Sequence, residues 1–329
     1  MIGIQHVKVS NRDANFKFDL YRNITIVRGK SGTGKTTLYD MIVDHTRLKD
    51  ESGVNISCAK DCVALVDIDW KNQLIGIFDS IVFIDEGAEY IKTPEFAKAV
   101  KNSDNYYVIF SRESLHDLPY SVEEIYEIKA SGKYHKFVKM FKSDKNHIYS
   151  ASNTRRKFQF DIFLTEDSKS GYQFFKNCFD GTKVICESSG SNSEIFKWLR
   201  NYVEQENFRE KKVFVLADGA AFGSEIDRVL KLQSSTDDNF RICLPESFEW
   251  LILKSGLIKV SDLVSVLENP SEYIDSRDYF SWENFFEDFL IRNTLNTPFQ
   301  YAKKEINPIY LNKNNSKKIT EEIHLKSEE

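Results

Sequence analysis

Short apolar runs, separated by polar turns, recur along the first 130 residues and predict strands. Three of these runs are uninterrupted, at residues 24–27, 81–84 and 106–110. Such runs are typical of strands that are buried on both faces of a parallel sheet. An earlier strand pair is expected at 2–9 and 16–18, and residues 37–43 continue as an amphipathic helix. Together they predict an α/β domain over residues 1–150.

Beyond residue 150 the pattern alternates between strands and helices. Strands are predicted at residues 158–164, 183–186, 213–217 and 241–244. Helices are predicted at residues 194–205, 224–232, 246–254 and 278–293. Strands separated by helices indicate a small, mainly parallel sheet with right-handed crossovers. We therefore predict a smaller α/β domain over 151–300, followed by a polar, flexible tail over 301–329 that is rich in Lys and Asn.

Composition is consistent with two packed domains. The chain has 329 residues, of which 41% are apolar and 25 are Phe. Its five cysteines follow neither a disulfide framework nor a zinc-ligand spacing. No apolar stretch approaches the ~20 residues of a membrane span, and Met1 leads directly into a strand-like run. We expect a cytoplasmic protein with no membrane partner.

The distribution of charge gives one local feature that needs an explanation. The net charge is −5, and residues 1–150 carry as many basic as acidic side chains, so a basic nucleic-acid-binding body is not indicated. Lysines nevertheless recur at every third position, at Lys133, Lys136, Lys139, Lys142 and Lys145. The stretch begins as the second arm of a hairpin that is predicted to turn at 131–132. The favoured interpretation is a solvated edge hairpin protected by lysines, and the alternative is contact with a phosphate backbone.

A glycine-rich motif at residues 29–36 carries the strongest chemical signal. It reads G-x-x-x-x-G-K-T, between a predicted strand and a predicted helix. Its glycines allow backbone N–H groups to point at phosphate oxygens, and the helix N-terminus favours an anion. Lys35 supplies a charge for the β- and γ-phosphates, and the Thr36 hydroxyl is suited to Mg²⁺. The predicted nucleotide contacts are Gly29, Ser31, Gly32, Thr33, Gly34, Lys35, Thr36 and Thr37.

Acidic and polar residues follow two of the other buried strands. Asp85 and Glu86 close the run at 81–84, and Ser111 and Arg112 close the run at 106–110. Asp85 is expected to hold Mg²⁺, and Glu86 to orient or deprotonate the attacking water. Ser111 or Arg112 is expected to contact the γ-phosphate. We take Lys35, Glu86 and Ser111 as the catalytic candidates.

With these motifs, residues 1 to about 130 resemble a compact P-loop ATPase that has a glutamate beside the Walker B aspartate. The resemblance implies binding and hydrolysis of ATP with Mg²⁺, in a protein that we expect to be oligomeric. No Leu-Ser-Gly-Gly signature is present, and 48 residues separate Thr36 from Asp85, so a complete ABC-type head is not implied. No guanine-selecting Asn-Lys-x-Asp element occurs in a fitting place, which leaves ATP as the default. Arg112, Arg155 and Arg156 are the candidates for an arginine finger.

Acids near the ends of predicted strands in the second half carry a second resemblance. Glu187, Asp218 and Glu246 follow the strands at 183–186, 213–217 and 241–244. Residues 180 to 260 resemble the Toprim fold of topoisomerases, primases and overcoming-lysogenization-defect nucleases. This family ends one strand in Glu-Gly and a later one in Asp-x-Asp, where this chain has Ser188 and Ala220 as the second partners. The resemblance implies a Mg²⁺ site made by Glu187, Asp218 and Glu246.

Other interpretations of the same loops stay open. The small residues at 188–193 and 219–223 also suit tight turns with helix caps, or an anion site. Two functions therefore remain. One is an ATPase that controls a Toprim-like domain acting on nucleic acid, as in phage-defence or mobile-element proteins. The other is a nucleotide-switched protein whose second domain binds a partner and has no nuclease activity.

Overall fold

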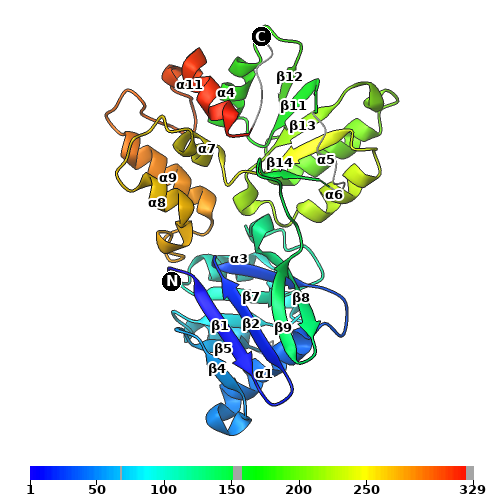
Figure 1. Cartoon of the computed structure of the whole chain (residues 1–329), viewed down its shortest axis with the longest axis vertical. Helices are drawn as coiled ribbons and strands as arrows, with labels where there is room; N and C mark the ends of the chain where they lie inside the picture. Colours follow the sequence, from blue (N-terminus) through cyan, green and yellow to red (C-terminus); the bar gives the residue numbers. More distant parts are fainter. Residues whose placement is uncertain (67–68, 151–157, 324–329) are drawn as a thin grey trace. The chain divides into compact units, whose positions relative to one another are not determined.

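The computed structural model describes residues 1–66, 69–150 and 158–323, which form two compact units. Unit 1 comprises Met1–Phe141 and Glu268–Ser281, and unit 2 comprises Lys142–Leu267 and Trp282–Glu329. Both are mixed α/β structures, as the sequence predicts (Figure 1). The first boundary falls between Phe141 and Lys142 rather than at residue 150. In addition, Glu268–Ser281, a segment late in the sequence, belongs to unit 1.

Unit 1 is built on a nine-stranded sheet in the order β4-β1-β2-β9-β8-β3-β7-β6-β5. In that order the strands are Asn55–Ser57, Gln5–Ser10, Asn15–Leu20, Tyr134–Lys139, Ile125–Ser131, Ile24–Arg28, Tyr106–Phe110, Ile81–Ile84 and Cys62–Leu65. Its α-helices are α1 (Lys35–Leu48), α2 (Trp70–Ile75) and α3 (Pro94–Lys101). The sheet passes from antiparallel strands around β1 to parallel strands around β3.

The parallel half of the sheet confirms the predicted strands. Every residue of β3, β6 and β7 is buried, as expected of strands covered on both faces. Strand β7 lies between β3 and β6 and runs parallel to both, and Ile109 is level with Ile26 on one side and Ile84 on the other. The carboxyl ends of these three strands therefore lie side by side.

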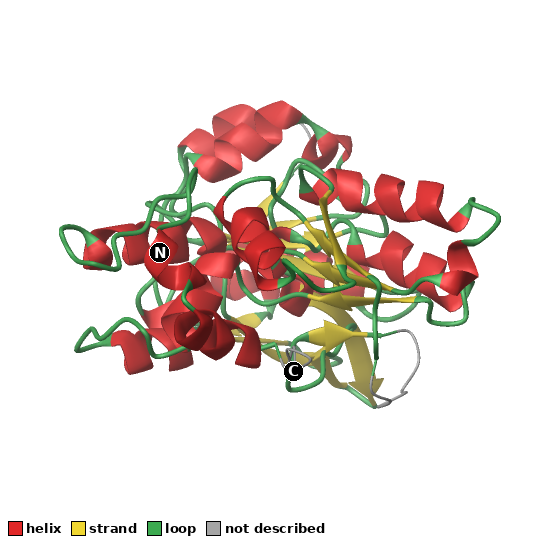
Figure 2. Ribbon diagram, turned by 90° about the horizontal axis from the view of Figure 1, so that it is seen from above, coloured by secondary structure: helices red, strands yellow, loops and turns green. Residues whose placement is uncertain are grey.

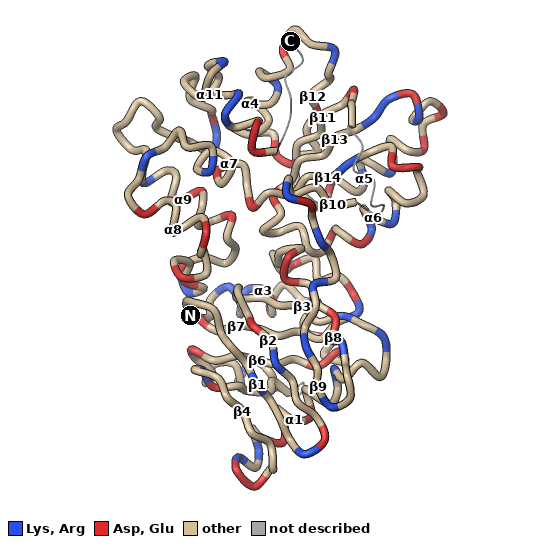
Figure 3. The backbone as a smooth tube through the Cα atoms, viewed as in Figure 1, with Lys and Arg blue, Asp and Glu red and all other residues tan. Residues whose placement is uncertain are grey.

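The predicted hairpin is present, but it is not at a sheet edge. Strands β8 and β9 pair antiparallel, and β9 also pairs in parallel with β2. Basic residues recur along β9 (Figure 3), and Lys139 pairs with Glu123. The interpretation of an edge hairpin protected by lysines is therefore wrong, because both sides of β9 carry a neighbouring strand.

The segment Glu268–Ser281 is joined to unit 1 by charged contacts. The N-terminal ammonium of Met1 lies 2.8 Å from an oxygen of Asp275 and donates to the Ser276 hydroxyl at 2.9 Å. Arg277 pairs with Asp104 at 3.3 Å. The sequence did not predict this return of the chain, because these partners are more than 170 residues apart.

Unit 2 is built on a smaller, five-stranded sheet in the order β10-β14-β13-β11-β12. In that order the strands are Ile148–Tyr149, Phe240–Cys243, Val213–Leu216, Ile162–Thr165 and Ile185–Ser188, and all pairings are parallel except that of β10 with β14. Helices α4 (Ser170–Cys178) and α5 (Asn192–Val203) lie on opposite sides of this sheet (Figures 1 and 2). Further along the chain come α6 (Ile226–Ser234), α7 (Phe248–Lys254), α8 (Leu263–Glu268) and α9 (Trp282–Thr294).

The predicted flexible tail is in fact folded as far as residue 323. It forms α10 (Pro308–Leu311) and α11 (Lys313–Glu321). Tyr301, Tyr310 and Ile319 are buried. The segment is polar overall, yet these few apolar side chains suffice to anchor it. Across the described residues, no helix is long and apolar enough to cross a membrane.

A buried carboxyl makes the stability of unit 1 depend on pH. Burial, opposed by the charge of Arg22, raises the pKa of Glu124 from its ordinary value of 4.5 to about 7. A carboxyl with a raised pKa in the folded state contributes stability that is fully present below its unfolded pKa. That contribution is lost as the pH rises through the folded pKa.

We expect Glu124→Gln, which cannot ionise, to lose less stability than the native chain between about pH 5 and about pH 8. The free energy of unfolding that the native chain loses exceeds the loss in Glu124→Gln by roughly 3 kcal/mol once Glu124 is fully ionised. Urea unfolding at both pH values measures it, with Glu95→Gln on the exposed face of α3 as the control. An unchanged pH dependence in Glu124→Gln would contradict the assignment.

Candidate functional sites

The loop at residues 29–36 connects β3 to α1 and contains three glycines in the left-handed region. The φ angles are 137° at Gly29, 79° at Gly32 and 100° at Gly34. Residues other than glycine rarely adopt these φ angles. At Gly34 a side chain would also meet a neighbour, because an added Cβ would lie 3.1 Å from the His135 ring. The geometry explains why the motif needs glycine at these positions.

Lys35 is the first residue of α1 and folds back over this loop. Its side chain is buried, and its Nζ donates to the carbonyl oxygens of Gly29 at 2.7 Å and Lys30 at 3.1 Å. No side chain caps α1, and its first turn contains no acid. The helix N-terminus therefore presents positive charge beside a fixed ammonium group, which is an arrangement suited to an anion.

The predicted acids lie beside this loop because β6 ends at the same edge as β3. Glu86 Oε2 is 3.5 Å from Lys35 Nζ, and Glu86 Oε1 pairs with Arg112 at the end of β7. Arg112 also donates to the Ser31 hydroxyl at 3.0 Å. The Glu86 carboxylate is thus held between two cations, and Arg112 links it to the glycine-rich loop.

Asp85 lies close enough to α1 to affect a helix residue. Burial and then the charge of Asp85 raise the pKa of Asp40. Thr36 and Thr37, in the first turn of the same helix, are exposed, whereas Thr33 donates within the loop to the Lys30 carbonyl at 3.1 Å. A hydroxyl and a carboxylate supply the oxygen ligands that Mg²⁺ takes, so Thr36 and Asp85 fit the ion that the motif implies.

The structure distinguishes the two predicted contacts at the end of β7. The Ser111 hydroxyl donates to the Glu113 carbonyl at 2.9 Å and accepts from the Glu113 N–H at 3.1 Å. It therefore closes a local turn, whereas the Arg112 guanidinium is directed at the loop. Arg155 and Arg156, the other arginine candidates, lie outside the described residues.

In unit 2, acids meet at the carboxyl ends of β11 and β13. The Asp218 N–H donates to Glu166 Oε2 at 2.9 Å, and the Glu166 N–H donates to the Leu216 carbonyl at 3.1 Å. Burial, followed by nearby acids, raises the pKa of Glu166 to about 8 and that of Asp218 well above its ordinary value. Glu166 was not predicted, although it directly follows an apolar run.

Other helices add charged groups to these acids, including a buried lysine. Lys303 Nζ lies 2.9 Å from Glu249 on α7, and 3.7 Å and 3.8 Å from Glu283 and Glu287 on α9. The Tyr301 hydroxyl donates to Glu249 at 2.5 Å. Burial opposes ionisation of Glu249, but Lys303 and Tyr301 outweigh it and lower its pKa. We call Glu166, Asp218, Glu249, Glu283 and Glu287 the carboxylate cluster.

The predicted metal site at Glu187, Asp218 and Glu246 is not supported. Within residues 1–66, 69–150 and 158–323, no group of three or more His, Cys, Asp or Glu side chains is arranged to hold a metal ion. Glu187 lies within β12, level with Leu164, rather than beyond the strand end. Glu246 precedes α7, whereas Glu249 inside that helix joins the cluster.

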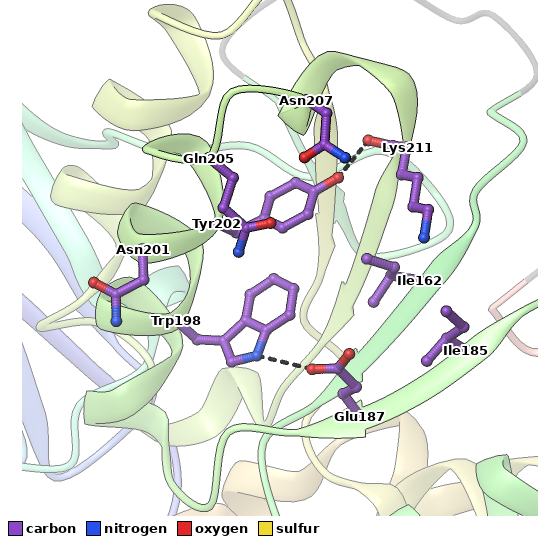
Figure 4. A pocket seen from close by; sticks show the side chains of 9 residues that line it. All are labelled: Ile162, Ile185, Glu187, Trp198, Asn201, Tyr202, Gln205, Asn207 and Lys211. Atoms are coloured by element: carbon purple, nitrogen blue, oxygen red, sulfur yellow. Dashed lines mark hydrogen bonds between the residues drawn. The ribbon is translucent and has the colours of Figure 1, made fainter.

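Glu187 instead faces a separate pocket of about 410 Å³ (Figure 4). Its carboxylate accepts a hydrogen bond from the Trp198 indole at 3.1 Å. The Trp198 ring stacks on Tyr202, whose hydroxyl donates to the Lys211 carbonyl at 2.7 Å. These contacts give Glu187 a position in the wall of the pocket.

Comparisons of the chain with protein-family models, with curated proteins and with solved structures found no match. The geometry of the two sites is therefore what bears on function.

The close approach at Gly34 gives a test of the loop geometry. Gly34→Ala places a side chain at a φ of 100° and against His135, which stacks on Phe16 with ring centroids 4.4 Å apart. Gly53→Ala is the matched control, because Gly53 has a φ of 68° and an added Cβ there would meet nothing within 4 Å.

Both substitutions introduce backbone strain of about 1–2 kcal/mol. We expect Gly34→Ala to cost more than Gly53→Ala, because the stacked rings must also move. Urea unfolding of both variants measures the difference. Equal costs would show that the packing of His135 against the loop is not significant.

Proposed function

We propose that unit 1 binds and hydrolyses ATP with Mg²⁺, as in a P-loop ATPase. One observation carries the proposal: Lys35 is fixed over a glycine-rich loop at a helix N-terminus, with a carboxylate 3.5 Å away. Phosphate binding requires the cation and the backbone N–H donors, whereas hydrolysis requires the carboxylate. The order of the strands supports both roles, since β3, β7 and β6 end at one edge.

Each residue then has a defined role. Lys35 and the backbone N–H groups of the loop bind the phosphates, and Arg112 contacts the γ-phosphate. Thr36 and Asp85 would hold Mg²⁺, which neutralises phosphate charge. Glu86 orients the attacking water and accepts its proton.

The ion pairs of Glu86 suggest how this role is controlled. Lys35 and Arg112, which hold its carboxylate, are also the side chains that phosphate attracts. When they turn to the phosphates, the carboxylate loses two charge partners. It is then able to accept a hydrogen bond from water.

We further propose that the nucleotide state of unit 1 controls unit 2. The resemblance of unit 2 to the Toprim fold points to action on nucleic acid, in phage defence or a mobile element. A specific observation favours the second function, a nucleotide-switched interaction protein: a lysine lies among the acids that a nuclease would need for metal. A cleavage assay with nucleic acid, Mg²⁺ and Glu166→Gln as the control separates these functions.

The role of Lys35 is tested by its removal. We expect Lys35→Ala to weaken ATP binding by one to several kcal/mol, the order of a lost charge-assisted contact. Lys30→Ala, which removes an exposed lysine of the same loop, is the control and should bind ATP much as the native chain does. Calorimetric titration with ATP measures both. An unchanged affinity of Lys35→Ala for ATP would contradict the assignment of the site.

The role of Glu86 is separable from binding. We expect Glu86→Gln to bind Mg-ATP while its turnover falls by roughly 10²-fold or more, because the amide cannot accept the proton of the water. Glu89→Gln, an exposed glutamate paired with Lys92, is the control. Phosphate release and ATP titration are measured for both variants. A native rate in Glu86→Gln would place the base elsewhere.

A further inference from the structure

Lys303 is a largely covered cation beside three members of the carboxylate cluster. Only 18% of its side chain is exposed, and it lies within 4 Å of three carboxylates from two helices. Glu249, its nearest partner, is completely buried. A buried carboxylate is costly unless a cation compensates it, so Lys303 has the role that a metal ion has in other acidic sites.

The chain holds Lys303 in this place through main-chain contacts. The Ser170 N–H donates to the Lys303 carbonyl at 3.1 Å, and the Gln173 side chain donates to the Lys304 carbonyl at 3.1 Å. The Tyr301 hydroxyl bridges Glu249 and the Ser170 hydroxyl, at 2.5 Å and 2.6 Å. Residues 301, 303 and 304 are thus fixed to α4 or to the cluster, and these contacts hold the lysine in place.

The space beside Lys303 is too small for a hydrated divalent ion. A cavity of about 20 Å³ is lined by Glu166, Asp167, Asp218 and Lys303, among others. About 10–15 Å³ is needed for a single water molecule, whereas Mg²⁺ usually keeps several waters. The residue two positions after Asp218 is Ala220, which offers no ligand. The acids supply oxygen ligands, but the Lys303 ammonium lies among them and the space is small, so the native site is unsuited to the hydrated metal ion that a Toprim-like domain implies.

We propose that the Lys303 ammonium is the resident cation of the carboxylate cluster, in the place where a divalent metal ion would otherwise be needed. The cluster then stabilises the domain and sets the positions of α4, α7 and α9. This inference is independent of the ATP site, because all the groups involved belong to unit 2.

Mn²⁺ titration of the full chain, without nucleotide, tests this inference. An Asp85→Asn background removes the Mg²⁺ ligand proposed for unit 1. We expect no saturable Mn²⁺ binding below about 1 mM in this background, the range in which weak protein sites bind divalent ions. Lys303→Met should gain one bound Mn²⁺ with at least ten-fold higher affinity, because the cluster loses its cation. Asp218→Asn added to Lys303→Met should abolish the gain.

Lys304→Met is the matched control, since Lys304 is the exposed neighbour, and it should gain nothing. Lys303→Arg keeps the positive charge and should also gain nothing, whereas Lys303→Gln removes the charge, should gain the same ion and covers the case in which Lys303→Met does not fold. The proposal is overturned if the Asp85→Asn chain binds one Mn²⁺ and Asp218→Asn removes it. It is also overturned if folded Lys303→Met binds no Mn²⁺.

Discussion

Side chains along strands that are buried on both faces are covered by the core and not open to a ligand, even where they are polar, as Thr25 and Arg28 of β3 are. This constraint decides where chemistry is found in both units. In unit 1 the whole of β3, β6 and β7 is apolar or buried, so Lys35, Glu86 and Arg112 all come after strand ends. In unit 2 Glu166 and Asp218 follow β11 and β13 in the same way. Parallel pairing brings these ends to one edge, where open α/β sheets place their ligands.

Each site pairs a lysine with carboxylate, one in unit 1 and three in unit 2, but the two lysines are held differently. Lys35 Nζ donates to two main-chain carbonyls and lies 3.5 Å from Glu86. All three partners are oxygen atoms, and a phosphate oxygen is able to take the place of each. Lys303 lies beside Glu249, Glu283 and Glu287 in a buried position. Leaving Glu249 unpaired there would cost several kcal/mol. The first lysine is suited to exchange partners with a ligand, and the second is suited to remain in place.

The first site was predictable because its parts are local in the sequence. The loop, its lysine and the first turn of α1 are contiguous, and Asp85 and Glu86 directly follow a buried run. For the second site the prediction of Asp218 agrees with the structure, whereas Glu187 and Glu246 lie outside the carboxylate cluster, and for Glu187 the reason is strand register. The strand at β12 begins two residues later than expected, which brings Glu187 level with Leu164 inside the sheet. Lys303 could not be predicted, since it comes from a polar segment 54 residues beyond Glu249.

The topology of unit 1 connects the glycine-rich loop with the point where the chain passes into unit 2. His135 lies against Gly34 and stacks on Phe16, so a shift of the loop acts first on β9. Strand β9 ends at Lys139, two residues before unit 1 passes into unit 2. The strand is held on both sides, by β2 and β8, and therefore moves with the sheet rather than separately. A sheet interior is a stiffer connection than the edge hairpin that the lysine pattern favoured, because its displacement is resisted by hydrogen bonds along both edges.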